Sequence, residues 1–209
     1  ELSENFYKKK TSLVRYDVEK SVKAAIFIAA LLIPLLAVLG DEIGDFLYSN
    51  ELSGQIVQNC AFILLPMCIT MITTTVLNSM NCEKKTLIYF FFGAAFMLAS
   101  IITLTRFVGV YSYMIGLAGS YVITGALNLR LLKKNCPDVK FFKYGVHALI
   151  AIISSCAFGI LLDGIISNYV SEIWQMLICA PACLAFSAAF LYCLEMFTLH
   201  PFKKLISKN

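Results

Sequence analysis

The sequence predicts an all-α membrane protein that crosses the bilayer six times. Three observations indicate this fold class: the mean hydropathy is +0.79, only 14% of the residues are charged, and long apolar runs alternate with short charged stretches. A soluble globular domain carries about a quarter charged residues, so a bilayer is the natural solvent for this chain. The net charge of +4 does not indicate nucleic-acid binding, because the information lies in its distribution.

Six runs are long enough to span the hydrocarbon core, which takes about 20 apolar residues per helix. Each is expected to be helical, because backbone groups cannot remain unpaired in lipid. The alternating pattern of a membrane β-barrel is absent. The expected spans are, approximately, Val22–Gly40, Ile56–Met80, Thr86–Thr105, Gly109–Leu132, Tyr144–Leu162 and Ile173–Leu199.

The basic residues predict the orientation of these spans. Of the 17 Lys and Arg residues, all but Arg106 lie before the first span or at its mouth, after the sixth span, or in and directly beside alternate connections. Cytoplasmic loops are enriched in Lys and Arg, so we expect a multi-pass protein of the cytoplasmic membrane with both termini in the cytoplasm. The opposite connections carry acidic residues: Asp41, Glu42, Asp45, Glu51, Asp163 and Glu172.

The polar segments outside the spans are less distinctive. Residues 1–20 mix charges with aromatic and aliphatic side chains, which suits either a cytoplasmic connector or an interfacial amphipathic helix. Asp41–Gln55 predicts a short external amphipathic segment. The chain starts with Glu1 and shows no signal peptide, so we expect a fragment or a processed chain.

No catalytic signature is present, and the sequence predicts neither an enzyme nor a cofactor. Phosphate-loop, HExxH and GxSxG motifs are all missing. The eight cysteines form no CxxC pair and no Cys/His metal spacing, so buried free thiols are expected and no metal site.

Polar residues at membrane depth are the candidate functional residues. The second span carries a stripe of them on one helical face: Asn59, Pro66, Thr70, Thr74 and Asn78. The stripe could line a hydrated cavity. Alternatively, its Thr and Asn side chains could hydrogen-bond to neighbouring helices and serve packing alone.

Three further features allow two interpretations each. Pro34, Pro66 and Pro181 lie within expected helices and could act as transport hinges or as static kinks. Arg106 could grip an anionic substrate or pair with an outer acidic residue (Asp41, Glu42 or Asp163), or it could simply be solvated. His147 and Glu195, both near the cytoplasmic face, could form a titratable pair.

Small residues recur on the fifth span, where they would permit either close helix packing or a groove for a lipid tail. They are Gly145, Ala148, Ala151, Ser154, Ser155 and Gly159.

The order of features from Ser21 to Lys134 resembles a known transporter superfamily. A helix with a mid-span proline is followed by an outer loop, a polar-striped helix, a tight basic turn, a plain helix, a short outer turn and a helix ending in basic residues. The matching segments are AALLIPLLAVL (Ala29–Leu39), FLYS (Phe46–Ser49), FILLPMCITMITTTVLNSMN (Phe62–Asn81), EKKTL (Glu83–Leu87), RFVGVYSYMIG (Arg106–Gly116) and NLRLLKK (Asn128–Lys134).

This pattern is similar to the C-terminal half of the multidrug/oligosaccharidyl-lipid/polysaccharide (MOP) flippases, which include the MATE transporters. Within that superfamily it resembles the stage V sporulation protein B-like polysaccharide exporters, relatives of the cell-wall lipid II flippases. The resemblance implies a division into a connector (1–20), a four-helix part of the C-terminal lobe (21–134) and two further helices with a cytoplasmic tail (135–209).

The resemblance also implies alternating access between two lobes and a lipid-linked oligosaccharide or polysaccharide precursor as cargo. The partners would be membrane lipids, this saccharide, and an N-terminal lobe of the same protein or a second copy. The superfamily's cationic cavity residues have no counterpart here. The last two spans would form a groove for the lipid tail. A non-transporting scaffold, or a half-size protein that needs a partner lobe, is the alternative function.

Overall fold

The computed structural model describes residues 2–8, 11–48, 51–137, 141–166 and 172–193. Within these ranges all regular structure is helical, and six helices are long and apolar enough to cross a membrane. The prediction of an all-α, six-span membrane protein is therefore confirmed. The helices are α1 (Leu2–Tyr7), α2 (Thr11–Tyr48), α3 (Glu51–Cys60), the 3-10 turn η1 (Ala61–Ile63), α4 (Leu64–Ser79), α5 (Glu83–Val108), α6 (Tyr111–Asn135), α7 (Phe141–Ile166) and α8 (Glu172–Cys193).

The chain divides into two compact units. The first comprises residues 1–26 and 62–141, and the second residues 27–61 and 142–209. Helix α2 contributes to both. The division into 1–20, 21–134 and 135–209 was drawn from the resemblance and not from contacts, and it stays a prediction.

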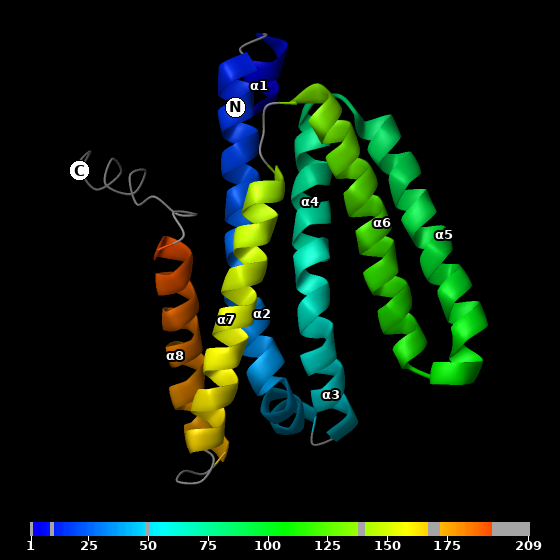
Figure 1. Ribbon diagram of the computed structural model, residues 1–209. Coiled ribbons are helices and arrows are strands. Elements are labelled where there is room, and N and C mark those ends of the chain that lie inside the picture. Colours follow the sequence, from blue (N-terminus) through cyan, green and yellow to red (C-terminus); the bar gives the residue numbers. More distant parts are fainter. Residues whose placement is uncertain (1, 9–10, 49–50, 138–140, 167–171, 194–209) are drawn as a thin grey trace. The chain divides into compact units, whose positions relative to one another are not determined.

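In the first unit, α6 packs against both α4 and α5, and Figure 1 shows these three helices side by side. Two tight turns make this possible. Asn81 (φ 59°) follows α4 in the left-handed conformation, and the Cys82 N–H donates to the Leu77 carbonyl at 3.0 Å, which closes the end of α4. Gly109 (φ 57°) reverses the chain between α5 and α6.

The start of α2 also belongs to this unit. Val14 and Val18, one turn apart, are buried against Val76 and Leu77 of α4 and Leu132 of α6. Residues 11–20 are therefore a continuation of the first membrane helix. The helix begins eleven residues before Val22, the expected start of the apolar span, because hydropathy marks only the part of a helix that lies in lipid.

In the second unit, α2 and α3 form a close hairpin. A Cβ on Gly44 would lie 2.2 Å from the Cα of Gly54, so the two backbones touch where only glycines fit. The Gln58 side-chain amide donates to the Ala37 carbonyl at 3.0 Å. The expected external segment Asp41–Gln55 is thus mostly the end of α2 and the start of α3.

The rest of α2 packs against α7 and α8. Val38, Leu39 and Cys179 form a buried cluster, with Leu162 of α7 beside it. Phe158 of α7 stacks on Phe186 of α8, with ring centroids 4.1 Å apart and planes 8° from parallel.

Candidate polar cavity between α4, α5 and α6

A cavity of about 480 Å³ opens between three helices of the first unit. This volume lies within the range of small-molecule pockets. Side chains from α4, α5 and α6 line it: Thr70, Thr74, Asn78, Glu83, Lys84, Thr86, Leu87, Phe90 and Thr124. Three of the residues predicted from the second span are therefore brought together at one site.

Each of these three residues also makes a hydrogen bond to a neighbouring helix. Thr70 Oγ1 donates to the Tyr121 carbonyl at 2.9 Å. Thr74 Oγ1 accepts from Asn128 Nδ2 at 2.8 Å, and Asn78 Oδ1 accepts from Thr86 Oγ1 at 2.7 Å. The stripe both lines a cavity and connects the helices, so the two sequence-based interpretations do not exclude each other.

Asn128 of α6 lies behind the stripe and was not predicted from the sequence. Its side chain is fully buried, and among the residues that the structure describes its Oδ1 has no hydrogen-bond partner. A buried acceptor left unpaired costs about 1–3 kcal/mol, which is unusual for a residue that serves packing alone. The signal that could have found it is its position four residues after Thr124, on the same face of α6.

Glycines leave room for the threonine hydroxyls. A Cβ on Gly125 would lie 2.7 Å from Thr70 Oγ1, and a Cβ on Gly93 would lie 2.3 Å from Thr124 Oγ1. Small residues let membrane helices approach closely. At Gly93 and Gly125 this close approach occurs beside the hydroxyl groups of Thr124 and Thr70.

The other candidates lie elsewhere. Asn59 is on α3 in the second unit, where its amide donates to the Gln55 carbonyl of the same helix at 2.7 Å. Arg106 is exposed in the last turn of α5, where a positive charge complements the helix dipole. Its suggested acidic partners belong to the second unit. A cavity role for Asn59 and a substrate or pairing role for Arg106 stay predictions.

The prolines occupy two kinds of position. Pro34 and Pro181 lie inside α2 and α8, as expected. Pro66 lies within the helical span Leu52–Ser79, as the third residue of α4 and shortly after the 3-10 turn η1. His147 is on α7, and Glu195, its suggested partner, lies outside the described residues.

The described residues thus define a polytopic α-helical membrane protein with a polar cavity in one of its two units. Across these residues, no three His, Cys, Asp or Glu side chains form a group that could hold a metal ion. No protein family matches the chain, nor does any curated protein or solved structure.

Proposed function

We propose that the chain is one lobe of a flippase that moves a lipid-linked oligosaccharide across the cytoplasmic membrane by alternating access. The observation that carries this proposal is the cavity lined by Thr70, Thr74 and Asn78. Polar groups at membrane depth are costly and tend to mark substrate pathways. A purely structural stripe would be expected to pack closed.

The lining suits a saccharide better than a strongly charged group. Hydroxyl and amide groups from Thr74, Asn78 and Thr86 can donate to and accept from sugar hydroxyls. The charges of Glu83 and Lys84 balance, so the lining has no net charge. In this proposal, a phosphate or diphosphate is held by the second lobe, from the same protein or from a partner copy.

A non-transporting scaffold is the second candidate, and the three interhelical hydrogen bonds of the stripe favour it. The two functions differ in what loss of a stripe side chain does. In a scaffold, substitution lowers stability. In a flippase, it lowers transport while the fold remains.

The experiment compares Asn78→Leu with Thr75→Val in the protein as it occurs in its membrane. Thr75 is exposed, bonds only its own helix (Met71 carbonyl, 2.9 Å) and lies outside the cavity lining. Flipping of a fluorescent lipid-linked saccharide in vesicles should fall at least tenfold for Asn78→Leu and stay unchanged for Thr75→Val. Equal flipping by both variants, with equal expression, would reject transport through this cavity.

A further inference from the structure

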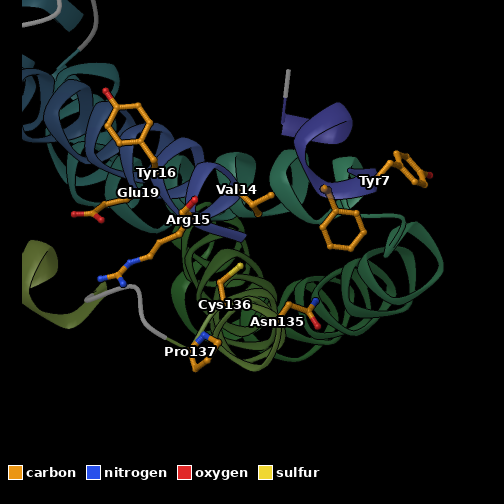
Figure 2. Close-up of a pocket in the computed structure, with 10 residues that line it drawn as sticks. Tyr7, Val14, Arg15, Tyr16, Glu19, Asn135, Cys136 and Pro137 are labelled. Atoms are coloured by element: carbon orange, nitrogen blue, oxygen red, sulfur yellow. The ribbon is translucent and has the colours of Figure 1, made fainter. Parts of the chain in front are cut away.

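A second and larger pocket lies where α2 begins and α6 ends. Its volume is about 1140 Å³, and Figure 2 shows that its lining comes from α1, the first turns of α2 and the residues that close α6. The lining residues are Phe6, Tyr7, Ser12, Val14, Arg15, Tyr16, Glu19, Asn135, Cys136 and Pro137. All of them belong to the first unit.

The length of α2 places this pocket at the level of the lipid headgroups. The uncharged part of the helix runs for 17 residues, from Ala24 to Gly40, about 26 Å at 1.5 Å per residue. That is close to the hydrocarbon thickness of about 30 Å. Arg15 precedes Lys23 by eight residues, about 12 Å, and therefore lies beyond the apolar core.

The pocket combines an apolar base with amphipathic aromatic side chains. Val14 is buried and belongs to the same core cluster as the ends of α4 and α6, and Cys136 packs against that cluster. Tyr7 and Tyr16 are 68% and 59% exposed at the rim. Tyrosine is enriched at membrane–water interfaces, where its ring meets the acyl boundary and its hydroxyl meets water.

The start of α2 and the last turn of α6, which both contribute to the lining, carry more basic than acidic residues. Arg15 and Glu19 are its charged lining residues, and the Glu19 carboxylate is ion-paired with Lys23 at 3.1 Å. The residues from Arg15 to Lys23 and the last turn of α6 hold five basic side chains against two acidic ones. The basic ones are Arg15, Lys20, Lys23, Lys133 and Lys134, and the acidic ones are Asp17 and Glu19.

We propose that this pocket binds the headgroup of an anionic phospholipid, with the Arg15 guanidinium on the phosphate and the first acyl carbons over Val14. Basic pockets between membrane helices bind anionic headgroups. Guanidinium matches phosphate geometry through paired hydrogen bonds. The volume is large enough to admit a headgroup with its glycerol. The proposal is independent of transport and needs only that the protein lies in a bilayer.

The test titrates the purified full chain in neutral detergent with phosphatidylglycerol or phosphatidylcholine and counts bound lipid by native mass spectrometry. We expect one saturable phosphatidylglycerol site. Because one basic side chain contributes about 1 kcal/mol to attraction of anionic lipid, Arg15→Gln should weaken binding about fivefold. Arg15→Lys should weaken phosphatidylglycerol binding less than Arg15→Gln does. Arg106→Gln is the matched control, because Arg106 is an exposed arginine in the last turn of α5, at the opposite end of that helix from the α4–α5 turn. This variant should bind phosphatidylglycerol like the parent.

A second variant covers the case in which Arg15→Gln disturbs the fold. Ser12 is an exposed lining residue in the first turn of α2, where a carboxylate favours the helix. Ser12→Glu should therefore keep helicity by circular dichroism yet weaken phosphatidylglycerol binding about fivefold or more. Equal binding of the two lipids, an equal loss in Arg106→Gln, or parental binding by Ser12→Glu would each overturn the proposal.

Discussion

Replacing Gly44 by alanine should force apart the two helices of the α2–α3 hairpin. The added Cβ would lie 2.2 Å from the Gly54 Cα and 2.3 Å from its nitrogen, against at least 3.4 Å for an ordinary contact. These are backbone atoms, so no side-chain rotation relieves the clash. The helices must separate locally by about 1.2 Å (3.4 minus 2.2).

The magnitude follows from two terms. Overpacking a tight contact costs about 1–3 kcal/mol. Separation also breaks the Gln58–Ala37 hydrogen bond, and such bonds between membrane helices contribute about 0.6 kcal/mol on average. We therefore expect Gly44→Ala to lower the free energy of unfolding by about 2–4 kcal/mol.

The matched control is Gly145→Ala on α7, where a Cβ would meet nothing within 4 Å. Alanine is preferred over glycine in a helix by about 0.8–1 kcal/mol, so this variant should be as stable as the parent or more so. Both are measured by SDS-induced unfolding in mixed micelles, followed by circular dichroism. Equal stability of the two variants would refute the close backbone approach.

Two further substitutions test the packing around the cavity and in the second unit. Asn128→Leu removes a hydrogen bond to Thr74 worth about 0.6 kcal/mol, together with an unpaired buried acceptor that costs about 1–3 kcal/mol. The unfolding free energy should therefore stay equal or rise, and a fall of more than about 2 kcal/mol would show that Oδ1 is satisfied. Phe186→Leu loses ring contacts to Phe158 and Phe190 and should destabilise by about 1–3 kcal/mol in the same assay. Phe92→Leu, at an exposed ring, should change stability by less than about 0.5 kcal/mol.

The sequence predicted the number and type of the long helices because the length of an apolar run is set by the bilayer. It did not predict their ends. The extension of α2 to Thr11 depends on Val14, Val18 and Val22, which recur every four residues and are buried. The sequence shows that spacing, but the charged residues beside these valines lower the local hydropathy. A prediction based on hydropathy therefore begins the helix too late.

The candidate site was predictable in part for a similar reason. Thr70, Thr74 and Asn78 share a helical face by spacing alone. Their partners come from other helices. The spacing from Thr124 places Asn128 on the same face of α6, but its bond to Thr74 and the role of the glycines at 93 and 125 follow only from how the helices pair in space. Asn59 was predicted from the same spacing but lies on α3, before η1 and in the second unit, whereas Arg106 is an isolated polar residue that gives no spacing to interpret.

Solvent access to adjacent positions on α4 tests the polar cavity most directly. Thr74 lines it, whereas Thr75, the next residue at nearly the same depth, is exposed on another face and lies outside the lining. In a background without native cysteines, Thr74→Cys should react with a membrane-impermeant maleimide, and Thr75→Cys, facing lipid, should not. Reaction of Thr75→Cys at the rate of Thr74→Cys, or no reaction at Thr74→Cys from either side of the membrane, would contradict a water-filled cavity along this stripe.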